Sequence, residues 1–127
     1  MRFYQFGIVK VSRYDVSNLL ESKGYKHMAE KQLRWGILGA ARVNEKLLPA
    51  IVEAANAKLV AIASRRPGAA AEVLQKLAPE QTEVETLDDP EALLSHSQID
   101  AIYLPMSNEE HAEWALKAIN HGKHVLI

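Results

Sequence analysis

The 127-residue chain predicts an α/β fold, in which helices cover both faces of a doubly wound parallel sheet of about five strands. Two observations support this prediction. From residue 33 onward, apolar runs of strand length alternate with longer segments in which apolar residues recur at helical spacing. The strand-like runs are also apolar almost throughout, which is typical of parallel strands that are buried on both faces.

The composition indicates one domain and excludes several functional classes. Hydrophobic residues make up 48% and charged residues 24%, and the formal net charge of −1 favours neither a nucleic-acid partner nor a membrane partner. The absence of cysteine excludes disulfides and thiolate metal sites. No apolar run approaches the roughly 20 residues that span a bilayer, and the N-terminus lacks a signal-peptide core. We therefore expect a cytoplasmic protein.

The first 31 residues differ from the remainder in holding six basic and three acidic residues. Residues 3–11 could form a short strand and residues 16–21 one or two helical turns, but neither has a clear partner. We expect residues 1–31 to be a poorly ordered N-terminal extension, because termini without a docking surface stay loose. An ordered arm, or a natural start at Met28, are the alternatives. The predicted domain then covers residues 32–127.

Apolar spacing and turn residues place the individual elements of this domain. The expected strands are 33–38, 58–64, 83–86, 100–104 and 124–127. The expected helices lie between them at 43–54, 67–77, 88–95 and 107–121. The first helix has an inner face of Val43, Leu47, Leu48, Ile51 and Ala54. In the last helix, Ser107-x-x-Glu110 predicts a capping box, and the expected buried stripe is Ala112, Ala115, Leu116 and Ile119.

The turn after the first strand carries a loose version of a phosphate-binding pattern. The sequence Gly39-x-Ala41-x-x-Asn44 follows the pattern G-x-G-x-x-G, in which glycines permit a sharp turn and a close approach to a pyrophosphate at a helix N-terminus. Asn44 replaces the third glycine, which weakens the expectation of close helix–strand packing there. A plain strand-to-helix turn would also explain these residues alone. The candidate pyrophosphate-binding residues are Gly39, Ala40, Ala41, Arg42 and Val43.

The end of the second strand indicates which dinucleotide would bind. An acidic residue at this position binds the ribose 2′-hydroxyl of NAD, whereas arginine accommodates the 2′-phosphate of NADP. Here the chain reads Ser64-Arg65-Arg66, and the next acid is Glu72. The guanidinium fork matches phosphate oxygens, so this stretch favours NADP, with NAD as a second choice. The alternative is a solvated basic turn.

Four ordered marks resemble the Gfo/Idh/MocA family of oxidoreductases over residues 33–127. The marks are Gly36-Ile-Leu-Gly39-Ala-Ala, Ala61-Ile-Ala-Ser-Arg65, Pro105-x-x-Asn108-x-x-His111 and Gly122-Lys-His-Val. The resemblance implies a Rossmann-like nucleotide-binding domain, whose strands, numbered along the chain, are expected in the order 3-2-1-4-5. It also implies that Leu104, Pro105 and Asn108 line the nicotinamide-ribose side, and that His111 anchors their loop.

The family resemblance also implies hydride transfer to or from a sugar, polyol or similar small molecule. In this family a Glu-Lys-Pro motif follows the fifth strand, and a second domain supplies most of the substrate pocket. This chain ends at Ile127, before that motif. We therefore interpret it as the NADP-binding N-terminal half of an oxidoreductase, with substrate bound only in a longer form. The alternative is a non-catalytic nucleotide-binding or interaction module.

Several further expectations concern partners and individual side chains. His96, His121 and His124 show no ligand spacing, so we expect no metal site. Trp114 and Tyr103 are expected to pack in the core, and Lys123 is interpreted as a solvated turn residue. The apolar fifth strand would lie at a sheet edge, which predicts self-association through its unpaired backbone groups.

Overall fold

The computed structural model describes residues 10–11, 14–15 and 32–127. Strands β1 (Lys10–Val11) and β2 (Tyr14–Asp15) form a two-stranded antiparallel sheet, in which Lys10 pairs with Asp15. The remaining expectations for the N-terminal segment, including its loose order, the helical turns at 16–21 and a start at Met28, lie outside the described residues.

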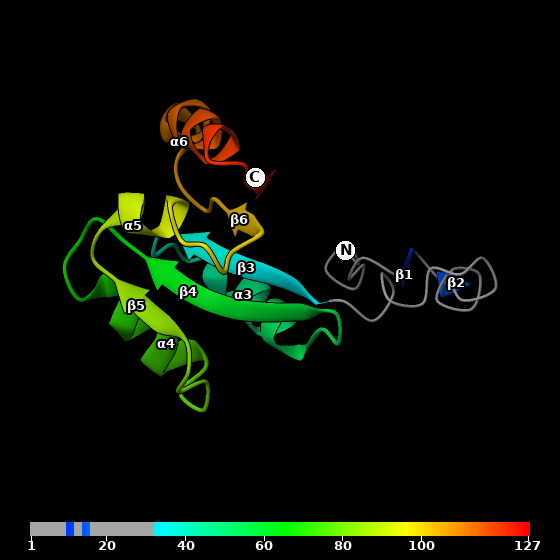
Figure 1. Ribbon diagram of the computed structural model, residues 1–127. Helices are drawn as coiled ribbons and strands as arrows, with labels where there is room; N and C mark the ends of the chain where they lie inside the picture. Colours follow the sequence, from blue (N-terminus) through cyan, green and yellow to red (C-terminus); the bar gives the residue numbers. More distant parts are fainter. Residues whose placement is uncertain (1–9, 12–13, 16–31) are drawn as a thin grey trace.

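The main sheet contains five strands, all parallel to one another. Its order is β5-β4-β3-β6-β7, which confirms the predicted fold class and strand order (Figure 1). The third strand along the main sheet begins two residues later and ends one residue later than predicted. The strands are β3 (Leu33–Leu38), β4 (Ala57–Ala63), β5 (Glu85–Leu87), β6 (Ala101–Tyr103) and β7 (His124–Leu126).

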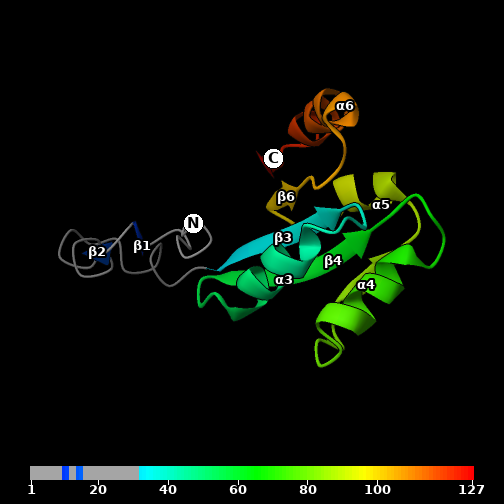
Figure 2. The same cartoon turned by 180° about the vertical axis from the view of Figure 1, so that it is seen from behind.

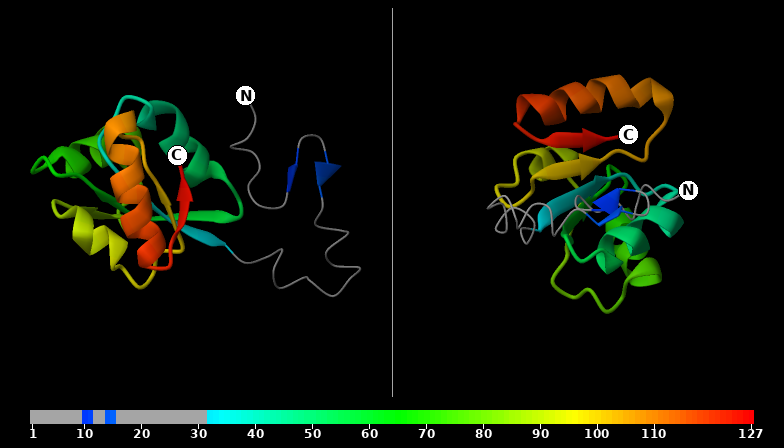
Figure 3. Two further views of the ribbon diagram at one scale, coloured as in Figure 1. Left: turned by 90° about the horizontal axis from the view of Figure 1, so that it is seen from above. Right: turned by 90° about the vertical axis from the view of Figure 1, so that its right-hand side faces the viewer.

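Helices cover both faces of this sheet, as two opposite views show (Figures 1 and 2). One face packs against α3 (Asn44–Glu53) and α4 (Ala69–Leu77), and the other packs against α5 (Pro90–Leu94) and α6 (Asn108–Asn120). The view from above places α6 beside β7 (Figure 3). Among the residues that the structure describes, no helix is long and apolar enough to cross a membrane.

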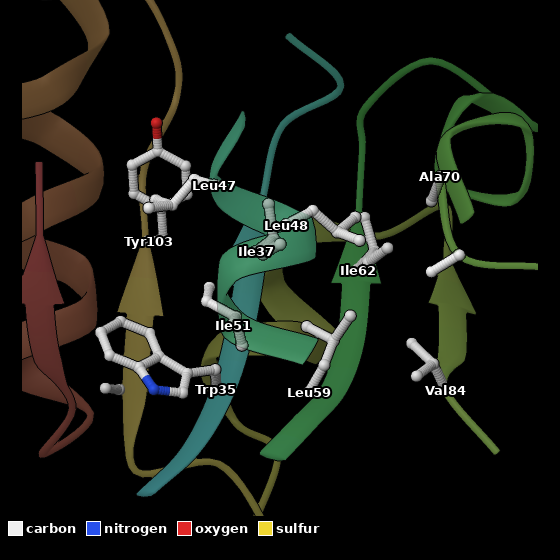
Figure 4. Packing of buried hydrophobic residues seen from close by; sticks show 12 residues of the cluster. Trp35, Ile37, Leu47, Leu48, Ile51, Leu59, Ile62, Ala70, Val84 and Tyr103 are labelled. Carbon is white, nitrogen blue, oxygen red and sulfur yellow. The ribbon is translucent and has the colours of Figure 1, made fainter. Parts of the chain in front are cut away.

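The core on the α3 and α4 face is built around the two central strands. Trp35 and Ile37 of β3 lie on this face with Leu59 and Ile62 of β4, and α3 lies over them (Figure 4). The spacing within β4 is irregular because the pairing register shifts between Trp35 and Gly36, so that Val60 is passed over. This shift returns Ile62 to the same face as Leu59. Tyr103 of β6 is buried in the same cluster, which confirms its expected packing role.

The opposite face is packed so tightly that β3 needs a glycine. A Cβ atom at Gly36 would lie 2.9 Å from Ile99 Cδ1 and 3.1 Å from Leu93 Cδ1. Leu93 belongs to α5, so the missing side chain allows that short helix to approach the sheet. The first glycine of the Gly36-x-x-Gly39 pair therefore serves packing.

Helix α6 presents a different face to the core from the one predicted. Trp114 and Ala118 are buried, whereas Leu116 is 62% exposed and Ile119 is 57% exposed. Ala112 is also exposed. Two apolar stripes of similar spacing exist on this helix, and the large indole of Trp114 takes the inner one. The prediction for Trp114 is confirmed, and the predicted stripe through Leu116 and Ile119 is wrong.

The amino ends of β3 and β6 are joined by an ion pair with several hydrogen bonds. Arg34 Nε donates to Asp100 Oδ2 at 2.9 Å, and Arg34 Nη2 donates to Asp100 Oδ1 at 2.8 Å. The backbone N–H of Arg34 donates to the same carboxylate at 3.0 Å. Hydrogen bonding to Asp100 raises the pKa of Arg34. The ion pair thus fixes the amino ends of β3 and β6 to each other, at the end of the sheet opposite the predicted site.

Lys123 contributes to the same end of the sheet, and its interpretation as a solvated turn residue is wrong. Its ammonium donates to the carbonyl oxygens of His96 and Ile99, at 2.6 and 2.8 Å. Burial lowers the pKa of Lys123. The long alkyl stem lets the charged group reach these carbonyls from the turn after α6, a contact that local sequence does not reveal.

Candidate functional site

Three segments predicted as cofactor-binding lie at the carboxyl ends of three neighbouring strands. The turn after β3 begins at Gly39, Ser64–Arg66 follows β4, and Leu104–Pro105 follows β6. Strands β4 and β6 flank β3 in the sheet. The chain leaves β4 toward α4 on one face of the sheet, and it leaves β6 toward α6 on the other face. This reversal is the topological switch point at which open α/β sheets bind their ligands.

Gly39 makes the sharp exit from β3 and brings two of these segments into contact. Its φ angle is +129°, a conformation that side chains of L-residues rarely adopt. Its N–H donates to the carbonyl oxygen of Ala63 at 2.8 Å, which ties the turn to the end of β4. A Cβ atom at this position would lie 3.6 Å from Pro105 Cγ, so the ring of Pro105 lies against the turn.

The four residues that follow Gly39 offer a row of backbone donors. The N–H groups of residues 40–43 have no hydrogen-bond acceptor within residues 32–127. Ala40 and Ala41 are half-buried, and Arg42 and Val43 are exposed. Such free amides at the start of a helix, together with the helix dipole, suit a bound anion. The residues present therefore fit the pyrophosphate of a dinucleotide.

Asn44 holds the turn from inside. Its side chain is fully buried, and Nδ2 donates to the carbonyl oxygen of Gly39 at 2.9 Å. Its Oδ1 has no partner among the described residues. The asparagine that replaces the third glycine is therefore accommodated in the interior at the start of α3. Val43, which was predicted to face the core, is 45% exposed because Asn44 takes the inward position.

The basic turn after β4 combines a buried hydroxyl with two exposed guanidiniums. Ser64 is 7% exposed, and its Oγ accepts a hydrogen bond from the N–H of Arg66 at 3.2 Å. The side chains of Arg65 and Arg66 are 62% and 67% exposed. Arg66 Nη1 lies 3.6 Å from Glu72 Oε2 in an exposed ion pair. Both arginines can therefore reach a ligand at this edge.

An ion pair between Arg65 and Glu110 joins the basic turn to the start of α6. Ser107 Oγ donates to the other carboxylate oxygen of Glu110 at 3.1 Å. Ser107 occupies the N-cap position of α6 without a side-chain cap hydrogen bond, so the predicted capping box is wrong. The carboxylate that would complete the box is directed to Arg65 instead. The sequence did not predict this role of Glu110, because no local pattern shows that the turn after β4 faces the start of α6.

The third segment is fixed by His111. Its Nε2 lies 2.9 Å from the carbonyl oxygen of Leu104, and since a carbonyl only accepts, Nε2 carries the proton. The N–H of Leu104 donates to Leu126 of β7 at 2.9 Å, so both polar backbone groups of Leu104 are bound. Leu104 and Pro105 are buried, whereas Asn108 is exposed. The contact between His111 and Leu104 is the anchoring that the sequence predicted.

A glycine turn with free amides, a basic turn after the neighbouring strand and a braced third loop are therefore gathered at one edge of a parallel sheet. These features define a dinucleotide-binding α/β domain. The chain belongs to the oxidoreductase family with an NAD-binding Rossmann fold, whose family model matches residues 33–127.

Several of the relatives are named as reductases or dehydrogenases of sugars. The chain is 37% identical over 97 residues to a dTDP-3,4-didehydro-2,6-dideoxy-α-D-glucose 3-reductase of Saccharopolyspora spinosa, covering 76% of this chain and 28% of the relative. It is 35% identical over 94 residues to a D-xylose 1-dehydrogenase (NADP(+)) of Haloferax volcanii, covering 74% of this chain and 28% of the relative. The chain thus spans little more than a quarter of the length of these relatives.

A similar structure is KijD10, a 3-ketoreductase from Actinomadura kijaniata, solved in complex with NADP. The TM-score is 0.68 with 33% sequence identity, covering 76% of this chain and 29% of KijD10. The glycine turn, the basic turn and the braced third loop of this chain all lie within residues 33–127, which the family model matches.

Proposed function

We propose that this chain binds NADP in preference to NAD, as the cofactor-binding part of an oxidoreductase. The observation that carries the proposal is the turn Ser64-Arg65-Arg66, which follows β4 and lies beside the free amides of the turn after β3. Planar guanidiniums with several N–H donors suit a phosphate at the adenosine ribose. The relatives support the choice, because one is named as an NADP-dependent dehydrogenase and another was solved with NADP.

In this proposal each segment has a distinct task. The amides of residues 40–43 bind the pyrophosphate, while Gly39 and Asn44 hold the turn in the shape that exposes them. Arg65, with Ser64 and Arg66, binds the adenosine ribose and its 2′-phosphate. Leu104, Pro105 and Asn108 line the nicotinamide-ribose half of the dinucleotide, and His111 holds their loop in place. The bound cofactor would supply hydride chemistry at its nicotinamide ring.

The substrate class follows from the relatives' names. A 3-reductase of a nucleotide-linked sugar and a D-xylose dehydrogenase both act on carbohydrate carbinol or carbonyl carbons. We propose that the longer protein transfers hydride between the nicotinamide and a sugar, polyol or similar small molecule. This chain covers little more than a quarter of the length of these relatives, so cofactor binding is the part of the proposed activity that is tested on it alone.

The proposal is tested by titration calorimetry of the chain with NADP⁺ and with NAD⁺. The unmodified chain is expected to bind NADP⁺ more tightly. Arg65→Asp should weaken NADP⁺ binding by about 10- to 100-fold, because charge-assisted hydrogen bonds contribute about 1.5–3 kcal/mol. NAD⁺ binding should change much less, since its ribose carries no phosphate there.

Lys58→Asp is the matched control for this test. Lys58 is exposed near the amino end of β4, so the substitution makes the same charge change at the opposite end of the same strand. It should leave the ratio of the two affinities nearly unchanged. Equal affinities of the unmodified chain for NADP⁺ and NAD⁺ would contradict the proposed preference.

A further inference from the structure

Glu110 is held on both sides of its carboxylate. One oxygen forms an ion pair with Arg65 Nη2, and the other accepts a hydrogen bond from Ser107 Oγ at 3.1 Å. The side chain of Glu110 is 29% exposed, against 62% for Arg65. The carboxylate is therefore the better-anchored partner, and the guanidinium is the partner more accessible to solvent.

The contact means that the arginine proposed to bind a phosphate already faces an anion. Arg65 meets Glu110 through a single terminal nitrogen, Nη2. A guanidinium has five N–H donors, so a second anion can approach its remaining edge while the carboxylate stays close. A 2′-phosphate carries more negative charge than a carboxylate, so it would be attracted by Arg65 and repelled by Glu110 at the same time.

Glu72, the other acid near the basic turn, is a weaker competitor. It lies 3.6 Å from Arg66, and both side chains are about 70% exposed. Exposed pairs of this kind are screened by water and salt and contribute little. Glu110 differs because Ser107 holds it at the start of α6, across β3 from the basic turn.

We propose that Glu110 lowers the selectivity of this site for NADP over NAD by competing with the 2′-phosphate for Arg65. This inference rests on the proposed NADP-binding function. The repulsion acts only on the phosphorylated cofactor. A 2′-hydroxyl has no charge, and a carboxylate can accept its hydrogen bond, as acids at this end of the fold do. Glu110 therefore narrows the preference for NADP over NAD and acts through the position and charge of Arg65.

The test is the substitution Glu110→Gln, which keeps the size of the side chain and removes its charge. The affinities of the chain for NADP⁺ and for NAD⁺ are measured by calorimetry at low ionic strength. NADP⁺ binding is expected to tighten by about three- to tenfold, the scale of one charge interaction in a solvated site. NAD⁺ binding is expected to stay the same or to weaken, so the ratio of the affinities rises at least about threefold.

Two variants separate this role from a structural one. Glu109→Gln removes a charge from the adjacent exposed residue, which forms no hydrogen bond or ion pair with Arg65, and should leave the ratio unchanged. Glu110→Asp keeps the charge and should keep the ratio close to that of the unmodified chain. Without nucleotide, the melting temperatures of the three variants should be similar to that of the unmodified chain, because none of the substituted side chains is buried in the core.

A double-mutant cycle tests the route through Arg65. In an Arg65→Gln background, Glu110→Gln should change NADP⁺ affinity by less than it does in the unmodified chain, because the competition for Arg65 is gone and only the direct repulsion between carboxylate and phosphate remains. The inference is overturned if Glu110→Gln weakens NADP⁺ binding, shifts both cofactors equally, or has an equal effect without Arg65. If the unmodified chain binds neither nucleotide, the proposed function itself fails, and this inference fails with it.

Discussion

The side-chain amide of Asn44 donates a hydrogen bond to the carbonyl oxygen of Gly39, five residues earlier, across a distance of 2.9 Å. This bond closes the turn between β3 and α3 from the inside. It orients the peptide that follows Gly39. The N–H groups of residues 40–43, which come next, have no acceptor within residues 32–127. Asn44 thus supports the shape of the candidate anion site without facing solvent.

Asn44→Asp should destabilise the chain strongly. It removes the donor and places a carboxylate against the carbonyl of Gly39 at a position with no exposed surface. An unpaired buried charge costs about 3–5 kcal/mol, whereas Asn44→Ala should cost about 1 kcal/mol through the lost hydrogen bond. Urea unfolding measures both. Asn120→Asp, at the exposed end of α6, is the control, and an equal loss in both aspartate variants would contradict the role given to Asn44.

The Arg34–Asp100 pair should contribute more to stability than the exposed pairs do. Asp100→Asn removes the charge that receives hydrogen bonds from the backbone and side chain of Arg34, at a site where Asp100 is 22% exposed. The urea midpoint should fall clearly. Glu72→Gln breaks the Arg66 pair at 71% exposure and should leave the midpoint nearly unchanged. If the two variants lose the same stability, the extra hydrogen bonds at the strand starts have no net effect.

Tyr103 should make the fold sensitive to alkaline pH. Burial raises the pKa of Tyr103 above its ordinary value of 10.0. The unfolded chain then loses this proton at lower pH than the folded chain does, so stability is present below about pH 10 and falls as pH rises through the folded pKa. Tyr103→Phe should flatten the fall in urea midpoint between about pH 9 and about pH 11. The contribution of Lys123 is common to both chains, so their difference isolates Tyr103, and parallel curves would contradict this assignment.

The chain should self-associate through β7. This strand pairs only with β6 in the described sheet, which leaves one row of backbone groups open beside Ile127, itself 62% exposed. Ile127→Lys should raise the monomer fraction in light scattering, because a charge discourages edge pairing. Leu116→Lys removes an equally exposed apolar residue from α6 and serves as control. If Leu116→Lys has the larger effect, association runs through the helix face instead.

Local sequence predicted most of the architecture, because its signals depend on residues close together in the chain. Leu33–Leu38 was predicted with its observed bounds, and β4 was displaced by one residue. The parallel direction of the five strands followed from the alternation of strand and helix patterns, and their order in the sheet followed from the family resemblance. The glycine turn and the basic turn were also visible, since each is a contiguous motif at a strand end.

Packing decided what periodicity left ambiguous. On α6 two apolar stripes have similar spacing, and only the fit of Trp114 against the sheet selects the buried one. At the start of α3 an asparagine, not a valine, faces inward because a backbone carbonyl lies within its reach. Lys123 likewise donates to the carbonyl oxygens of His96 and Ile99, which belong to a different loop that the fold brings within its reach. The contacts of Trp114 and Lys123 join residues far apart in the sequence, and the Asn44–Gly39 bond depends on the conformation of the turn, so apolar periodicity reveals none of them.

The sequence by itself determined the fold class, the family and the residue types offered at the cofactor site. The tertiary structure decided how those residues are paired. Arg65 and Glu110 are 45 positions apart and share no local pattern, yet the strand order β4-β3-β6 places their loops on either side of one strand. Charges that meet across a sheet are set by strand order and helix packing, and this is why the counter-ion of the proposed phosphate-binding arginine appears only in the folded chain.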